Sequence, residues 1–104
     1  MKVSVVSSAL IAAGLLLGVA QGAHASEALA RSKNCLSCHT VNKRVVGPSY
    51  KDIAIKYKGQ GAEAALAQKI RAGGSGSFGS IPMPASPNVS EAEAQQLARW
   101  ILSL

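Results

Sequence analysis

Acidic and aromatic side chains are scarce in this sequence of 104 residues, which has 5 Asp and Glu against 11 Lys and Arg and only 4% aromatic residues. The formal net charge of +6 favours acidic partners. The basic residues do not run together in one uninterrupted block, which argues against nucleic acid as the partner. So short a chain forms one small domain at most, and we expect another group to complete its underfilled hydrophobic core.

The chain also lacks the roughly 18 consecutive apolar residues that a membrane-spanning helix needs. Its longest apolar run covers residues 9–20, with Lys2 before it and the sequence Ala-His-Ala at residues 23–25 after it. A positive start, a short apolar middle and a small-x-small exit are typical of a secretory signal peptide. We therefore expect residues 1–25 to be cleaved and residues 26–104 to form a single exported domain without a permanent membrane anchor.

No convincing strand pattern is present, and the spacing of apolar residues predicts an all-α fold of short helices. The expected helices are one that Ser26 caps, with Leu29 and Leu36 on one face; one from Ser49 to near Gly59; one over residues 62–72; and one that begins with a capping box of Ser90 and Glu93. The 73–88 segment between the last two is rich in Gly, Ser and Pro. Because a loop of this length is usually functional or disordered, we expect a functional loop.

The sequence Cys35-Leu36-Ser37-Cys38-His39 carries the chemistry. C-x-x-C-H is the attachment sequence of c-type haem, in which both thiols form thioethers and the adjacent imidazole binds the iron. Three alternatives fit less well. A redox disulfide leaves the histidine unexplained, a zinc site lacks a fourth ligand among residues 26–104, and a structural disulfide across three residues closes almost no loop. We therefore predict one haem c, with Cys35 and Cys38 as covalent anchors and His39 as an iron ligand.

The second axial ligand follows by elimination. The side chains that bind haem iron are His, Met, Cys, Tyr or Lys, and residues 26–104 contain no second His, no third Cys and only one Met, which is Met83. Tyr50 and Tyr57 are more simply interpreted as packing on a helix face. Met83 lies between two prolines, whose rings stiffen the loop. Met83 can therefore approach the iron from the face opposite His39.

Four segments together resemble a class I c-type cytochrome, and more closely the small bacterial class ID group of periplasmic electron donors. They are the C-x-x-C-H motif, Val46-Gly47-Pro48-Ser49-Tyr50-Lys51-Asp52, Ile81-Pro82-Met83-Pro84 and Gln96-Leu97-Ala98-Arg99-Trp100. The resemblance covers essentially all of residues 26–104 in order. It implies the cytochrome c fold, with four to five short helices around one covalently bound haem, and periplasmic localisation.

The resemblance also implies particular contacts. Leu29 is expected to meet Trp100 or Ile101 where the terminal helices cross, and the Pro48 carbonyl to accept a hydrogen bond from Nδ1 of His39. The sequence departs from the group at one position, because Phe78 stands where a Trp usually donates a hydrogen bond to a haem propionate. Lys69 or Arg71 is then the remaining propionate partner, or both are ordinary solvated charges.

We therefore expect a monomeric one-electron carrier rather than an enzyme, because iron with His and Met ligands has no open position for substrate. Its expected partners are redox proteins with acidic docking surfaces. The donor would be one such as a membrane cytochrome complex, and the acceptor one such as a nitrite reductase, terminal oxidase or peroxidase. The rival hypothesis is a gas-binding haem sensor or peroxidase-like enzyme, which would need a displaceable sixth ligand.

A cluster of bases after the haem motif would steer an acidic partner: Lys43, Arg44, Lys51, Lys56 and Lys58.

Overall fold

The computed structural model describes residues 26–104, so the expected signal peptide at residues 1–25 lies outside the described residues. The described part is helical and contains no β-strand, which confirms the all-α prediction. A helical segment at residues 26–32 comes first. The elements that follow are the 3-10 helix η1 (Cys35–Ser37) and the α-helices α2 (Tyr50–Tyr57), α3 (Glu63–Ala72) and α4 (Glu91–Leu102).

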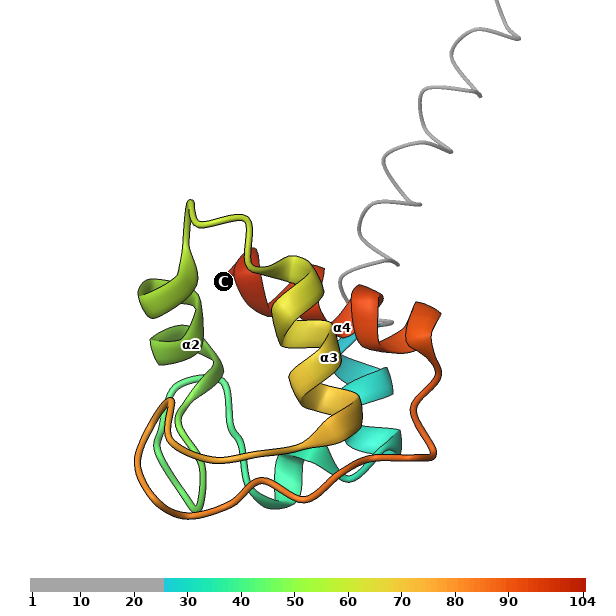
Figure 1. The fold of residues 1–104 in the computed structure, drawn as a ribbon, viewed down its shortest axis with the longest axis horizontal. Helices are drawn as coiled ribbons and strands as arrows, with labels where there is room; N and C mark the ends of the chain where they lie inside the picture. The colour runs from blue at the N-terminus through green and yellow to red at the C-terminus, as the bar shows by residue number, and fades with distance from the viewer. Residues whose placement is uncertain (1–25) are drawn as a thin grey trace, which may run out of the picture.

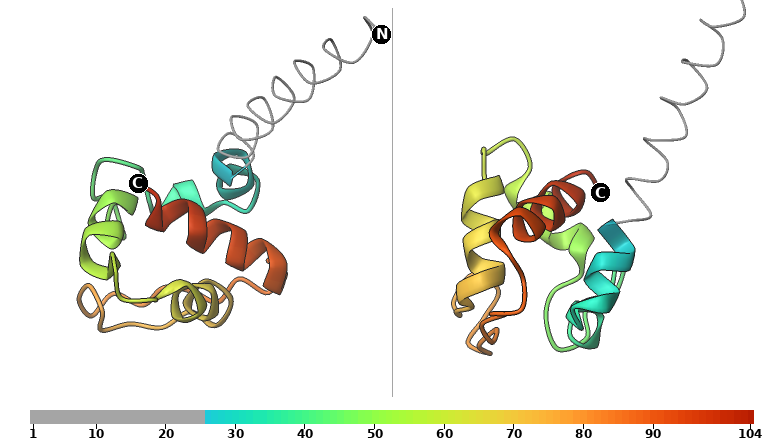
Figure 2. Two further views of the ribbon diagram at one scale, coloured as in Figure 1. Left: turned by 90° about the horizontal axis from the view of Figure 1, so that it is seen from above. Right: turned by 90° about the vertical axis from the view of Figure 1, so that its right-hand side faces the viewer.

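Helix α4 is the central element of the fold. It lies between α3 and the 26–32 segment, and it also contacts α2 (Figures 1 and 2). Its buried side chains, which include Leu97 and Ile101, form much of the core. Ala30 of the 26–32 segment is fully buried and belongs to the same core cluster, whereas Leu29 is only partly buried. An ion pair of 3.5 Å between Lys33 and Glu93 links the chain beyond that segment to the start of α4.

The helix starts agree with the local chemistry of the sequence. Ser49 precedes α2, and its hydroxyl accepts a hydrogen bond from the Asp52 amide at 3.1 Å. At α4 the predicted capping box is present, because the Ser90 hydroxyl accepts from the Glu93 amide and the Glu93 carboxylate accepts from the Ser90 amide. These side chains satisfy amide groups that lack partners within the helix.

The beginning of the described chain differs from the expectation. Ser26, the first described residue, is itself helical, so the cap expected there is not seen. The helix ends near residue 32, because Asn34 adopts a left-handed conformation with φ of 63°. Leu36 therefore lies in η1 rather than on the helix that carries Leu29, although both side chains pack against the core. The left-handed residue redirects the chain just before Cys35.

Candidate functional site

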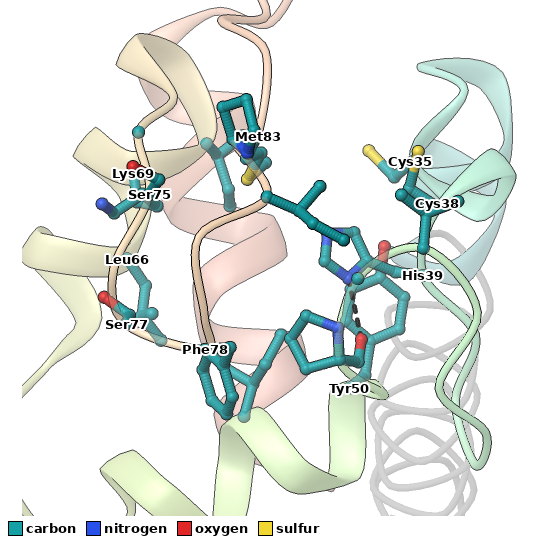
Figure 3. A pocket seen from close by; sticks show the side chains of 18 of the residues that line it. Cys35, Cys38, His39, Tyr50, Leu66, Lys69, Ser75, Ser77, Phe78 and Met83 are labelled. Atoms are coloured by element: carbon teal, nitrogen blue, oxygen red, sulfur yellow. Dashed lines mark hydrogen bonds between the residues drawn. The ribbon is translucent and has the colours of Figure 1, made fainter.

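An apolar cavity of about 300 Å³ lies among α2, α3, α4, η1 and the 73–88 loop. All five residues predicted to bind or anchor haem line it: Cys35, Cys38, His39, Pro48 and Met83. Figure 3 shows the two cysteines and His39 on one side and Met83 on the other. Side chains from α4 close part of the wall, including Leu97 and Ile101. The fold therefore brings residues up to 48 positions apart in the sequence to one cavity.

The orientation of His39 is set by its backbone surroundings. Nδ1 of His39 lies 2.8 Å from the carbonyl oxygen of Pro48. Because a carbonyl oxygen only accepts, Nδ1 carries the hydrogen, and the lone pair of Nε2 is available to a metal. Gly47 lies directly against the ring, since a Cβ atom built there would be 2.5 Å from Cε1 of His39. The residue before the proline must therefore be small.

Two aromatic rings support the imidazole from the core side. The ring of Tyr50 stacks on His39 with a centroid distance of 5.3 Å, and Trp100 meets Tyr50 edge to face at 5.2 Å. Burial, followed by the proximity of Cys35, raises the pKa of the Tyr50 phenol well above its usual value. The phenol is therefore neutral, and it supports His39 without adding a charge.

The two cysteines lie in and just after η1, and neither forms a disulfide. The amides of Cys38 and His39 both donate to the carbonyl of Cys35, at 3.2 and 3.0 Å. This tight turn brings Cys35, Cys38 and His39 to the same cavity wall. Burial is the main cause that raises the pKa of the Cys35 thiol, which lies half-buried in apolar surroundings.

Met83 is held by a pair of backbone hydrogen bonds with Gly74, which follows the end of α3. The Met83 amide donates to the Gly74 carbonyl at 2.7 Å, and the Gly74 amide donates back to Met83 at 3.0 Å. Gly73 has φ of 72°, and a Cβ atom there would collide with the Met83 carbonyl. A glycine is therefore required where α3 ends and the loop passes close to Met83.

The structure distinguishes between the residues that were candidates for contact with a haem propionate. Lys69 lines the cavity, whereas Arg71 does not and instead donates through Nε to the Val89 carbonyl at 3.2 Å. Phe78 lines the cavity and packs edge to face on Tyr57, with ring centroids 6.3 Å apart. Of the two candidate propionate partners, Lys69 is thus the one at the cavity.

Sequence reasoning missed two contacts to the 73–88 loop. Arg44 lines the cavity and donates to the Phe78 carbonyl at 3.3 Å, and Lys56 donates to the Ser77 carbonyl. From the sequence alone, both residues belong to the group of bases expected to steer a partner. No sequence motif predicts these contacts, because they join residues that are 34 and 21 positions apart in the chain.

Comparison with known proteins decides the family. The model of the family Cytochrome c matches residues 23–104. The chain belongs to the cytochrome c family. It is 51% identical to cytochrome c-551 of Pseudomonas aeruginosa over 96 residues, which cover 90% of each chain. It is 48% identical to cytochrome c-552 of Nitrosomonas europaea over 99 residues, which cover 94% of this chain and 89% of the relative.

The fold comparison agrees with the sequence comparison. The crystal structure of wild-type Nitrosomonas europaea cytochrome c552 matches with a TM-score of 0.72 and 52% identity, covering 75% of this chain and 98% of that one. These relatives confirm the resemblance to small bacterial class I cytochromes and the cytochrome c fold. The protein is accordingly an electron carrier with one covalently bound haem c, not an enzyme, and the rival sensor or peroxidase hypothesis is unsupported.

The described residues fit this cofactor. The cavity is largely apolar, and it offers two free thiols and an imidazole on one side and a thioether on the other. A porphyrin has the matching chemistry, because it is apolar on both faces and its iron takes nitrogen and sulfur ligands. The same group would supply the apolar bulk that the sequence lacks.

Replacement of Gly47 tests the close approach to His39. In Gly47→Ala the new methyl group would displace the imidazole, and we expect a loss of holoprotein and an altered absorption spectrum of what remains. Gly61→Ala is the matched control, because Gly61 has φ of 63° but nothing within 4 Å of a Cβ atom. The control should lower the free energy of unfolding by about 1–2 kcal/mol, because alanine is strained in the left-handed conformation, and leave the spectrum unchanged. Equal spectra in both variants would contradict the packing described for His39.

Proposed function

We propose that this protein carries single electrons between redox proteins of the periplasm, with His39 and Met83 as the axial ligands of its haem iron. Cys35 and Cys38 form the two thioether bonds, and Pro48 orients His39. The observation that carries this proposal is the placement of Met83 across one cavity from His39 and the cysteines. When bound, the haem supplies an iron that alternates between the ferric and ferrous states.

The protein's own residues serve this function by holding both ligands still. The Pro48 carbonyl keeps Nε2 of His39 free of hydrogen, and the Gly74 pairing holds the backbone at Met83. Rigid ligands reduce the rearrangement that accompanies electron transfer. A thioether ligand and an apolar cavity also favour the ferrous state, which raises the reduction potential.

The sensor or peroxidase hypothesis would need an open or catalytic side opposite His39. His39 is the only histidine among residues 26–104, and Met83 occupies the opposite side between two prolines. Arg44, a basic residue on the cavity wall, donates to a loop carbonyl. The arrangement therefore supports electron transfer over ligand sensing or peroxide chemistry.

The surface charge supports acidic redox partners. Within the basic cluster, the side chains of Lys43, Lys51 and Lys58 make no hydrogen bond or ion pair with any residue of the described range 26–104. Their charges are available to attract a partner. A donor such as a membrane cytochrome complex and an acceptor such as a nitrite reductase, terminal oxidase or peroxidase would fit this proposal, with the cytochrome acting as a monomer.

The signal peptide expected at residues 1–25 would direct export, and this supports the periplasmic assignment. The signal-like sequence at residues 1–25 motivates it, and haem attachment through C-x-x-C-H is in keeping with it. Among residues 26–104 no helix is long and apolar enough to cross a membrane.

Processing and attachment are tested together by intact mass. Protein made in a host that assembles c-type cytochromes should, after denaturation, have the mass of residues 26–104 plus one haem. Because thioether bonds are covalent, acid extraction should leave the haem attached. A retained segment 1–25, or haem lost on extraction, would contradict this part of the proposal.

Substitution of Met83 tests the sixth ligand. Once both cysteines are thioethers, Met83 is the only other sulfur in residues 26–104. Met83→Ala should therefore abolish the sulfur-to-iron charge-transfer band of the ferric protein, lower its potential and allow the ferrous protein to bind carbon monoxide. If the wild-type ferrous protein already binds carbon monoxide avidly at neutral pH, Met83 is not a firm ligand.

Salt dependence tests the steering charges. The second-order rate of electron transfer with an acidic redox partner should fall steeply as ionic strength rises, because salt screens long-range attraction. Lys43→Glu or Lys51→Glu should flatten this dependence. Arg31→Glu is the control, since it makes the same charge change on the 26–32 helix. A rate that stays flat or rises with salt would point to apolar docking instead.

A further inference from the structure

The loop that carries Met83 is bound at its tip, residues 76–79, by two basic side chains. Lys56, in the last turn of α2, donates from Nζ to the Ser77 carbonyl. Arg44, from the segment after His39, donates from Nη2 to the next carbonyl, that of Phe78, at 3.3 Å. Two consecutive loop carbonyls are thus bound by cations from two different parts of the chain.

Lys56 also contacts the aromatic rings beside this point. Its Nζ lies 4.5 Å from the ring centroid of Phe78 and 5.6 Å from that of Tyr57. A cation over an aromatic ring is attracted by the electrons of the ring face. Lys56 therefore holds both the backbone and a side chain of the loop tip against the end of α2.

The tip needs such contacts because its glycine-rich backbone has much conformational freedom and few hydrogen bonds of its own. Gly76 and Gly79 have φ of 102° and 117°, and the only backbone pairing within the tip joins the Gly76 amide to the Gly79 carbonyl at 2.8 Å. Glycine loses the most conformational freedom when it is ordered. The Gly74 pairing fixes the base of the loop at Met83, but it leaves residues 75–82 without a second backbone anchor to another element.

We propose that Lys56 and Arg44 are positioning residues that clamp the loop tip and thereby keep Met83 on the iron. The inference rests on the proposed function in taking Met83 as the sixth ligand. With the base pinned at Gly74 and the tip pinned at Ser77 and Phe78, the intervening chain cannot swing outward and draw the thioether away. The basic cluster then has two roles, because these two residues bind the loop while Lys43, Lys51 and Lys58 face partners.

Lys56→Met tests the clamp, since it retains an apolar side chain of similar length and loses the donor and the charge. The measurement is the rate at which imidazole binds the ferric holoprotein. In this ligand exchange an imidazole nitrogen would bond to the iron as the Met83 sulfur leaves, and the oxidation state of the iron would not change. We expect the rate to rise roughly tenfold or more, as the loss of one charged hydrogen bond predicts. Lys56→Arg, which keeps a donor, should remain near the wild-type rate.

Lys58→Met is the matched control, because it removes the same charge two residues away and its side chain contacts no described residue through a hydrogen bond or ion pair. Its imidazole rate should match that of the wild type. Equal rates in Lys56→Met and Lys58→Met would overturn the clamp. If both rates are raised, only a general charge effect remains, and if neither is raised, the Lys56 contacts do not restrain Met83.

Amide hydrogen exchange gives a readout independent of iron ligation. The Gly76 amide, which is bonded within the tip, should exchange faster in Lys56→Met and in Arg44→Gln than in Lys58→Met and Lys43→Gln. Unchanged exchange would contradict the clamp even if Met83 is the ligand. Conversely, a wild-type protein without the sulfur-to-iron band would refute the ligand assignment, while the exchange comparison would still decide the clamp.

Discussion

The hydrogen bond from Nδ1 of His39 to the Pro48 carbonyl is the contact on which the site depends. It orients the imidazole, and it ties the C-x-x-C-H segment to the residue that precedes the N-cap of α2. Two backbone bonds reinforce this junction, from the Gly47 amide to Cys38 and from the Tyr50 amide to Thr40, each at 2.8 Å. Tyr50 then stacks on the imidazole and reaches Trp100 of α4. The position of His39 is thereby coupled to the core.

The opposite side of the cavity is built by different means. Met83 belongs to no helix, and its backbone is paired to Gly74 at the end of α3 rather than to a regular element. A long loop in so small a domain costs conformational entropy on folding. The prolines beside Met83 reduce this cost, and the contacts at the loop tip offset part of it. The two proposed ligands therefore differ in support, since one is held by the core and the other by loop anchors.

Much of this arrangement follows from local sequence. The Ser90 and Glu93 capping box, the start of α2 after Pro48 and the end of α3 at Gly73 are set by neighbouring residues, so patterns in the chain predict them. The cofactor also follows, because few chemistries use C-x-x-C-H. The break at Asn34 was not predictable in the same way, since Asn adopts the left-handed conformation only in some contexts. Arg44 and Lys56 resemble solvated charges until the fold brings Phe78 and Ser77 beside them.

We propose above all that one iron is bound by His39 from one side and by Met83 from the other. X-ray absorption at the iron edge of the purified ferric protein tests this claim most directly, because sulfur and nitrogen neighbours scatter differently. We predict one sulfur neighbour in addition to the nitrogen atoms of the porphyrin and His39. A first shell of nitrogen or oxygen atoms alone, or an iron lacking a sixth neighbour, would contradict it.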